Sequence, residues 1–492
     1  MKKFNSYKIY LLLVSCVPGL MMSCQKLKET PESSLTPDAF YSTPAQCEAA
    51  LTGSMSFLYS TWNGYNATPS WPDGQQDGAS LAFTSTSFNV HWQWHYKAIA
   101  NINPVIKAIK AGKLSSYPAD VVNSVEGEAR FLRALNYFFL VRLYGRIPFI
   151  DENTPDPVTH PLTPASRLGI DTIYDKIEED LLFASGNMGD YDASTPGKPN
   201  KWAAKGMLAK VYLTRATAPL NEKDNYAKAR DMAADVIDNG PYDLLTDISQ
   251  VFKSGNNNNN EVMFAFQSSS DYPSMPGIAW APDEWGGWGV GPVKVLWAQA
   301  YPEQPRKHCY ILLDWPKDLT NPTANIVNYA SSNLGTPWMG KWNWPNLTVQ
   351  EELYGYTTMA PPILRFADVL LMYAEAANMA NGGPTQKAVD YLNRIITRAN
   401  TPYGNDVYGN PQQTGTEPLA NMNMAMADFD QKVLQERNYE LCFEFDRYFD
   451  VLRKRILKDV NLPDNANDYD DHDYLFPIPP SDAKYIGQNA GY

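Results

Sequence analysis

The chain has 492 residues, of which 13% are aromatic and 19% are charged, and its formal net charge at neutral pH is −13. This composition excludes an intrinsically disordered chain, and the acidic excess argues against nucleic acid as a partner, because nucleic-acid binding needs a basic surface. The length exceeds the usual size of one compact domain, so we expect several structural regions.

The first predicted element is a secretory leader. Lys2, Lys3 and Lys8 precede a mostly apolar run over residues 9–22, which is too short to span a bilayer as a helix. Cys24 follows Ser23 in a sequence that resembles a bacterial lipobox, although methionine stands at position −3, where leucine is usual. We therefore expect residues 1–23 to be a lipoprotein signal peptide, Cys24 to be lipidated and residues 24–40 to form a tether. The alternative is an ordinary leader that is cut nearby.

Helical patterns dominate two stretches of the remaining chain. We expect helices at residues 45–60, 92–112, 119–144, 168–185, 199–216, 225–239, 363–381, 384–399 and 428–456. They come in pairs joined by short turns, and their alanine-rich faces allow neighbouring helices to approach closely. This pattern favours an all-α fold with a tetratricopeptide-like helical repeat scaffold.

The helix predicted at 119–144 has almost no polar face in its second half. Phe131, Leu135, Phe138 and Val141 surround its axis instead of forming one stripe. Gly145 is well placed to end this helix. We therefore expect neighbouring elements to cover it on several sides.

A loop-rich stretch separates the two helical regions. It runs over residues 245–362, is rich in proline, glycine and asparagine, and includes one predicted strand at 261–266. Long segments of this kind are usually functional or have their own fold. The chain therefore divides into an N-terminal helical region at 41–244, an irregular insertion with minor β structure at 245–362, and a C-terminal helical region at 363–492. No segment after the leader has 18 consecutive apolar residues, so the sequence predicts no internal transmembrane helix.

Tryptophan is concentrated in the insertion, where eight of the thirteen tryptophans lie between residues 280 and 344. An indole offers a flat apolar face to a sugar ring and an N–H donor to a hydroxyl group. Glycine or polar neighbours favour exposure of Trp285, Trp288 and Trp342, and Trp71 lies in a similar loop. The alternative is that tryptophan fills the core of an irregular fold. The ligand-binding candidates are Trp71, Asp73, Asp77, Asp283, Trp285, Trp288, Trp342 and Asn343.

Other side-chain groupings favour structural roles over chemistry. His91 and His95 have a metal-ligand spacing but no third ligand nearby, so we predict no metal site and no cofactor. Glu440 and Glu444 favour a buried ion network with nearby arginines over an acid–base pair. Asp283 and Glu284 are adjacent, so they cannot readily flank one glycosidic bond. We predict no catalytic residues.

Cys47, Cys309 and Cys442 fit free buried thiols better than one disulfide bridge.

Several ordered segments resemble the SusD/RagB family of outer-membrane nutrient-binding lipoproteins from Bacteroidetes. They are Trp94–Asn103, Gly127–Pro148, Trp202–Leu213, Pro362–Ala376, Glu436–Asp450 and Phe476–Gly491. Arg146 departs from the family pattern, in which aspartate is common at that position. The segment at 303–306 also departs, and the tether lacks the acidic run often linked to surface export.

The resemblance implies a helical repeat scaffold whose irregular part carries the ligand site. It also implies a SusC-like TonB-dependent outer-membrane barrel as partner. The expected protein is lipid-anchored in the outer membrane, faces outward, binds an oligosaccharide or polysaccharide and delivers it to the transporter. A peptide-binding RagB-type protein is the alternative within the same fold. A glycan-cleaving enzyme and a helical scaffold without a ligand are the alternatives from other classes.

Overall fold

The computed structural model describes residues 40–62, 73–76, 89–155, 159–269, 271, 273–274, 280–289, 292–354, 357–444, 446–461 and 469–492. The predicted lipidation site Cys24 and the candidate residues Trp71 and Asp77 lie outside these ranges. The chain divides into a unit at 1–41 and a compact unit at 42–492, which is described below.

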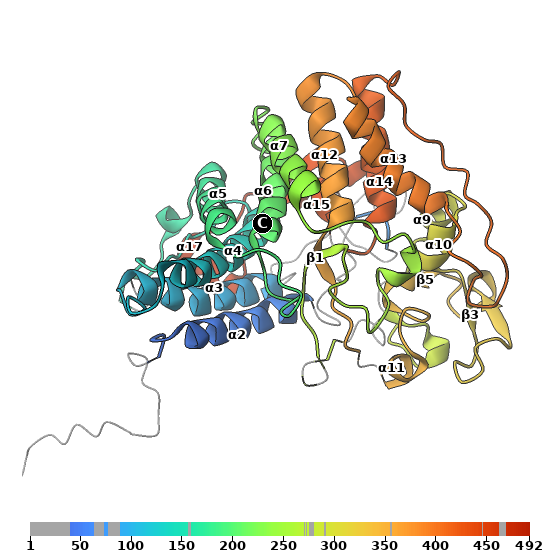
Figure 1. The fold of residues 1–492 in the computed structure, drawn as a ribbon, viewed down its shortest axis with the longest axis horizontal. Helices are drawn as coiled ribbons and strands as arrows, with labels where there is room; N and C mark the ends of the chain where they lie inside the picture. Colours follow the sequence, from blue (N-terminus) through green and yellow to red (C-terminus); the bar gives the residue numbers. More distant parts are fainter. Residues whose placement is uncertain are drawn as a thin grey trace, which may run out of the picture. The chain divides into compact units, whose positions relative to one another are not determined.

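The helices form a continuous stack in which each packs against its neighbour along the chain (Figure 1). The N-terminal set is α2 (Pro44–Trp62), α3 (Asn89–Lys110), α4 (Ala119–Tyr144), α5 (Ile170–Asn187), α6 (Lys201–Arg215) and α7 (Asn225–Asn239). The chain then leaves the stack for the insertion and returns in α12 (Phe366–Asn381), which packs against α7 and α6. Helices α13 (Gln386–Asn400) and α14 (Met426–Glu440) pack against α12 in turn. The predicted all-α scaffold of paired helices is confirmed.

Helix α4 is covered on several sides, as its apolar sequence predicts. It contacts α2, α3, α5 and α6, and Phe131, Leu135 and Phe138 are completely or almost completely buried. Gly145 ends the helix with a φ of 70°, a value that glycine adopts without strain. This central helix therefore contributes the largest share of buried aromatic side chains in the N-terminal stack.

The prediction of one continuous helix at 428–456 is wrong. It is interrupted after Glu440 by a turn at 441–444, in which Phe443 has a φ of 61°, and the chain resumes as α15 (Asp446–Lys454). Two tertiary contacts hold the turn, because Phe443 donates its backbone N–H to Gln75 Oε1 and accepts from Trp342 Nε1. The short helices α16 (Leu457–Asn461) and α17 (Pro480–Ile486) follow.

The described residues of the insertion form three two-stranded antiparallel sheets and several short helices. The sheets pair β1 (Val262–Ala265) with β6 (Pro362–Arg365), β2 (Ile311–Leu312) with β5 (Trp338–Met339), and β3 (Asp314–Pro316) with β4 (Ile326–Asn328). Strand β1 agrees with the predicted strand at 261–266. Among its described residues, the α-helices are α9 (Val295–Ala300), α10 (Pro305–Tyr310) and α11 (Val349–Tyr354). The pairing of β1 with β6 brings together the two ends of the intervening segment at 266–361.

A buried ion network joins the insertion to the C-terminal helices. Arg365 pairs with Glu261, Glu440 and Glu444, and Arg306 and Arg398 also pair with Glu440. A buried ion network around Glu440 and Glu444 is confirmed, but the cations that pair with these two carboxylates are Arg306, Lys341, Arg365 and Arg398, none of them nearby in sequence. Arg437 and Arg453 instead pair with Asp450, on α15.

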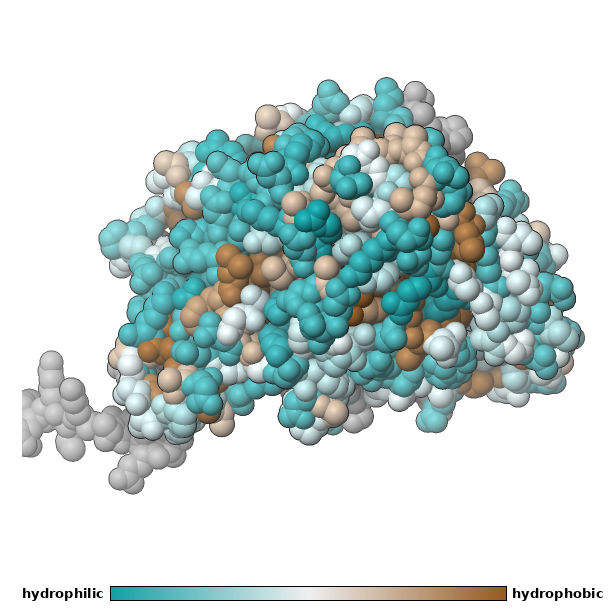
Figure 2. Space-filling view, turned by 45° about the horizontal axis from the view of Figure 1, so that its top comes forward, coloured by the Kyte–Doolittle hydropathy of each residue, from teal (hydrophilic) through white to brown (hydrophobic). Residues whose placement is uncertain are grey.

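The visible surface is mostly polar, and the three thiols of the described chain are buried. The face in Figure 2 is mostly hydrophilic, with apolar groups in small separate patches, as is usual for surfaces in contact with water. Cys47, Cys309 and Cys442 are free and buried, as predicted. Among the described helices, none has the length and apolar character needed to cross a bilayer.

Candidate functional site

Most tryptophans of the insertion form its core. Trp280, Trp315, Trp338 and Trp342 are at most 2% exposed, and Trp344 is 7% exposed. Trp315, Trp338 and Trp344 pack with Leu312 and Leu319 in one hydrophobic cluster. Strands of two to four residues bury little surface, so large indoles supply the apolar contacts that longer elements would otherwise provide. The alternative that tryptophan fills an irregular core is therefore correct for most of this group.

The predicted exposure of Trp342 is wrong, and Asn343 beside it is also fully buried. Trp342 Nε1 donates to Phe443 O at 3.0 Å, and its ring packs against Trp280 and Phe252. Asn343 Nδ2 donates to the carbonyl oxygens of Trp280 and Met339. The local glycine and polar neighbours did not reveal this burial because Phe252, Trp280 and Phe443 approach from distant parts of the sequence. Both residues hold the insertion together in this conformation.

A tight turn presents the other candidates at the surface. Asp283, Glu284 and Trp285 form a single helical turn, followed by Gly286 with a φ of 78°. Trp285 is half-buried because its Nε1 donates to Pro316 O at 2.8 Å and its ring packs edge-on against Trp344. Trp288 is 49% exposed. The structure thus places Asp283 and Trp285 on one turn, with Trp288 shortly after it, and leaves about half of the Trp288 side chain open to solvent.

Asp283 is exposed and already has one partner on a neighbouring loop. Its Oδ2 accepts from Asn333 Nδ2 at 3.1 Å, and Glu284 Oε1 accepts from the Asn333 backbone N–H at 3.0 Å. These bonds fix the turn against the segment that follows β4. The unshared carboxylate lone pairs leave Asp283 able to accept hydrogen bonds from hydroxyl groups.

A hollow of about 590 Å³, which was not predicted from the sequence, lies against Trp344, the residue that Trp285 contacts. Its aromatic walls are Trp344, Tyr403 and Tyr408, and the rings of Trp344 and Tyr408 have centroids 6.0 Å apart. Tyr408 is held in place because its hydroxyl donates to Asp314 O at 2.9 Å. The polar members of the lining include Lys253, His308, Asp314, Asn346, Asn405, Asp406 and Asn410.

The loop that supplies much of this hollow has a preorganised backbone. Asp406 Oδ1 accepts the backbone N–H groups of Tyr408 at 2.9 Å and of Asn410 at 2.7 Å. The sequence over 403–410 combines two tyrosines with glycine, asparagine and aspartate, which is a composition typical of adaptable binding loops. That composition is the signal that could have identified the segment, although it lies outside the region of high tryptophan density.

Asp73 lies beside the insertion, where its carboxylate supports the backbone. Residues 75 and 76 run along Val293 and Lys294, through a Gln76–Val293 bridge and a bond from Lys294 N to Gln75 O. Asp73 is 6% exposed, its Oδ1 accepts from Gln75 N at 2.8 Å, and burial raises its pKa to about 6. The structure thus brings the segment after Trp71 to the insertion but leaves the Asp73 carboxylate buried.

The two histidines with metal-ligand spacing lie in the helical core. His91 and His95 are fully buried on α3, and His95 Nδ1 lies 2.8 Å from Asn136 Oδ1. Burial lowers the pKa of His95 to about 4, so its ring is neutral at physiological pH. Within the described ranges, no group of three or more histidine, cysteine or acidic side chains is arranged to hold a metal ion.

Two family models match separate parts of the chain. The model described as the SusD family matches residues 317–485, and the model described as starch-binding associating with outer membrane matches residues 39–213. The SusD-like protein P2 of Formosa agariphila is 26% identical over the full length of both chains.

Solved structures share the fold. A SusD superfamily protein from Parabacteroides distasonis has a TM-score of 0.75 at 24% identity, and the match covers 92% of this chain and all of that one. A laminarin-binding SusD-like protein has a TM-score of 0.69 at 19% identity, with 91% and 99% of the chains covered. A structure with a xylogluco-oligosaccharide has a TM-score of 0.71 at 20% identity, with 89% and 96% covered. The tetratricopeptide-like scaffold is common to these proteins.

Proposed function

This chain belongs to the SusD/RagB family, and from that premise we propose that it captures an oligosaccharide with its insertion. A family model described as starch-binding, a laminarin-binding neighbour and a neighbour solved with a xylogluco-oligosaccharide support a glucan-like or related glycan as the ligand class. The proposed role is binding without catalysis, because the matching family model and the laminarin-binding neighbour are described by what they bind. The peptide-binding alternative within the same fold is an outcome of the test below.

The observation that carries the proposal is the aromatic and polar hollow next to the turn that exposes Trp288. Its volume of about 590 Å³ lies within the range of small-molecule sites. Tyrosine and tryptophan rings offer faces for the C–H side of sugar rings, and the carboxylates and amides accept or donate hydroxyl hydrogen bonds. We propose that Tyr403 and Tyr408 bind part of the oligosaccharide and that Trp288, with Asp283, provides a second contact.

Delivery and anchoring are further parts of the proposal. We propose that residues 1–23 are a signal peptide, that Cys24 carries the lipid anchor and that residues 24–40 are the tether. The captured glycan would pass to a SusC-like TonB-dependent barrel in the outer membrane. Modest affinity is sufficient for this role, since two linked sites raise the effective concentration of ligand at the second one. These parts are tested by co-purification. A barrel should co-purify with the full chain, and Cys24→Ala should abolish this co-purification.

The ligand is tested by titration of the full chain with laminarin, xyloglucan and starch oligosaccharides and with a peptide panel, followed by calorimetry. We expect saturable binding to one glycan class and no new reducing ends after several hours. An aromatic platform contributes on the order of 1 kcal/mol, so Trp288→Ala and Tyr408→Ala should each weaken binding by roughly fivefold or more.

The matched control is Tyr485→Ala. Tyr485 is 58% exposed on α17, outside the insertion, so its removal should leave glycan affinity unchanged. Binding to peptides alone would replace the glycan proposal with the RagB-type function. Equal losses in all three variants would show that the aromatic contacts of the insertion are not the site, and release of reducing ends would establish an enzyme.

A further inference from the structure

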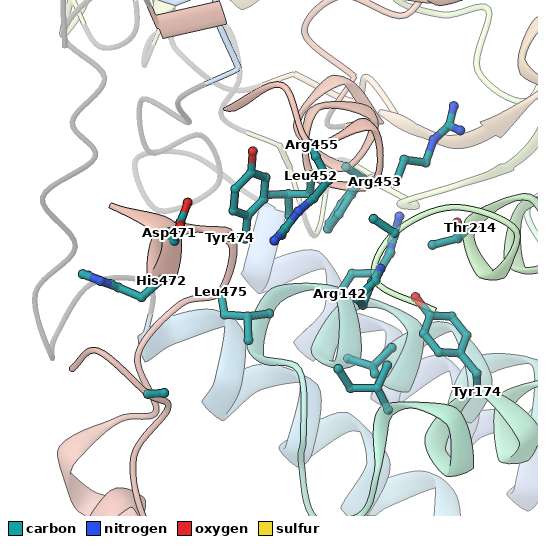
Figure 3. A pocket seen from close by; sticks show the side chains of 16 residues that line it. Arg142, Tyr174, Thr214, Leu452, Arg453, Arg455, Asp471, His472, Tyr474 and Leu475 are labelled. Atoms are coloured by element: carbon teal, nitrogen blue, oxygen red, sulfur yellow. The ribbon is translucent and has the colours of Figure 1, made fainter. Parts of the chain in front are cut away.

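A second cavity lies in the helical scaffold, among residues that the glycan proposal does not use. It has a volume of about 340 Å³ and is bounded by the end of α4, the start of α5, the turn after α6, helix α15 and the segment at 471–475 (Figure 3). Its walls are mainly apolar and include Val141, Ile170, Pro219, Leu452 and Leu475. This volume fits a small ligand of about ten or more non-hydrogen atoms.

The notable wall residue is Arg142. Its guanidinium carbon lies 3.7 Å from the ring centroid of Phe138 and 3.5 Å from that of Phe449, so the cation is held between two aromatic rings. Its Nε donates to Phe138 O at 2.9 Å. No carboxylate in the described part of the chain lies within 4.0 Å of its nitrogen atoms. Burial lowers the pKa of Arg142 to about 10, which leaves it charged at neutral pH.

The neighbouring charges do not neutralise this cation. Arg453 also lines the cavity, but its guanidinium turns away in Figure 3 and pairs with Glu375 and Asp450. Asp450 is therefore engaged with arginine, and Asp446 on the same helix pairs with Lys210.

The remaining charged groups lie toward the mouth of the cavity. Arg455 is exposed and stacks over the Tyr474 ring at 3.7 Å, which adds a second cation. Asp471 is exposed, and its Oδ1 accepts from the Tyr469 hydroxyl. His472 faces Asp470 and Asp473. The inner end of the cavity thus carries positive charge, and its acidic groups lie at the rim.

We propose that this cavity binds a small carboxylic acid with an apolar body. The carboxylate accepts hydrogen bonds from the Arg142 guanidinium, and the body packs against Ile170, Leu452 and Leu475. A planar guanidinium matches a carboxylate in both charge and geometry. A dianion such as phosphate fits less well, because a mostly apolar cavity with one inner cation would leave part of its charge uncompensated.

The probes for this site are 3-phenylpropionate and its uncharged amide, titrated into the full chain by calorimetry and ligand-observed NMR. We expect saturable binding of the acid at micromolar to millimolar concentration and at least tenfold weaker binding of the amide. This comparison uses the unaltered protein, so it remains informative whether or not a variant folds.

The variant test replaces Arg142 with methionine, which keeps an unbranched apolar side chain between the two rings. R142M should weaken binding of the acid at least tenfold and leave glycan binding unchanged, which separates this site from the insertion. The control is Arg230→Met, since Arg230 is a surface residue on α7 that pairs with Asp231. Equal binding of acid and amide, no binding of either at 10 mM, or an unchanged affinity in folded R142M would each overturn the proposal.

Discussion

At the scale of single residues, two adjacent glutamates of α11 have opposite environments. Glu352 is 3% exposed, its Oε2 accepts only from Trp344 N, and its Oε1 has no hydrogen-bond partner within the described ranges. Burial raises the pKa of Glu352 to about 8. Glu351 accepts from Ser254, Thr348 and Thr357, and these hydrogen bonds lower its pKa. Folding therefore favours the protonated form of Glu352 and the ionised form of Glu351.

Replacement of Glu352 with glutamine should stabilise the protein increasingly as the pH rises above about 4.5. The raised pKa means that the contribution of Glu352 to stability is fully present below about pH 4.5 and is lost as the pH rises through about 8. We expect E352Q to be more stable than the unaltered protein by roughly 1–3 kcal/mol at pH 8.5, with little difference at pH 4.5. Urea unfolding at the two pH values measures this effect.

Glu351→Gln is the control for that prediction. Because folding lowers the pKa of Glu351, its carboxylate contributes to stability above the pKa of the unfolded state, and this contribution is lost in acid. E351Q should therefore reduce the stability of the protein at pH 8.5. The two variants remove one charge each from neighbouring positions. Effects of the same sign at pH 8.5 would contradict the assignment of opposite environments.

Two tryptophans of the insertion show where reasoning from the sequence about the site fails. Trp288 and Trp342 both have glycine nearby, yet Trp288 is 49% exposed and Trp342 is 1% exposed. The Trp342 ring packs against Phe252 and Trp280, and its indole N–H donates to the carbonyl of Phe443, about 100 residues away. Local composition predicted a tryptophan-dense segment, but the exposure of each ring depends on distant residues that sequence spacing does not reveal.

At the scale of elements, the turn that carries Trp285 and Trp288 depends on close backbone approach at Gly287. A Cβ atom at this position would lie 2.2 Å from the carbonyl oxygen of Ala281, a contact that requires the backbone to move. Gly286 has open space around it but a φ of 78°. The two glycines therefore allow the turn for different reasons, one steric and one conformational.

Alanine at position 287 should disturb this turn and lower stability. We expect G287A to reduce the free energy of unfolding by roughly 1–3 kcal/mol and to weaken glycan binding, because Trp288 would be displaced. Thermal and urea unfolding, together with the glycan titration, measure both effects. At Gly383, in the turn between α12 and α13, a Cβ atom would meet no other atom within 4 Å, so G383A is the control and should change stability little. Equal effects at the two positions would show that close approach at Gly287 is not required.

Helices were predicted correctly where the spacing of apolar residues determines which side chains are buried. The helices near α3, α4, α6 and α7 were predicted because their apolar residues recur at helical spacing, and their ends agree within a few residues. The break between α14 and α15 was missed because the helical pattern continues through it. Its cause is tertiary, since Gln75 and Trp342 bind the backbone of Phe443. The hollow near Tyr408 was missed for a related reason, because its walls come from segments far apart in sequence.

At the scale of the whole molecule, Arg365 connects the insertion with the helical scaffold. It is the last residue of β6, directly before α12, and it is 1% exposed. Its guanidinium pairs with Glu261 at the base of the insertion, with Glu440 at the end of α14 and with Glu444 in the following turn. Removal of one partner from a buried ionic group leaves the others uncompensated, which is far more costly than loss of an exposed pair.

Arg365→Met should therefore destabilise the protein by roughly 3–5 kcal/mol and weaken the coupling between its two parts. Eight of the thirteen tryptophans lie in the insertion, so tryptophan fluorescence reports mainly on that region, whereas far-ultraviolet circular dichroism reports on the helices. In the unaltered protein the two urea transitions should coincide, and in R365M the fluorescence transition should occur at lower urea. Lys387→Met is the control, because the exposed Lys387–Asp238 pair should contribute less than about 1 kcal/mol. Coincident transitions in R365M with a loss no larger than in K387M would show that this network does not couple the insertion to the scaffold.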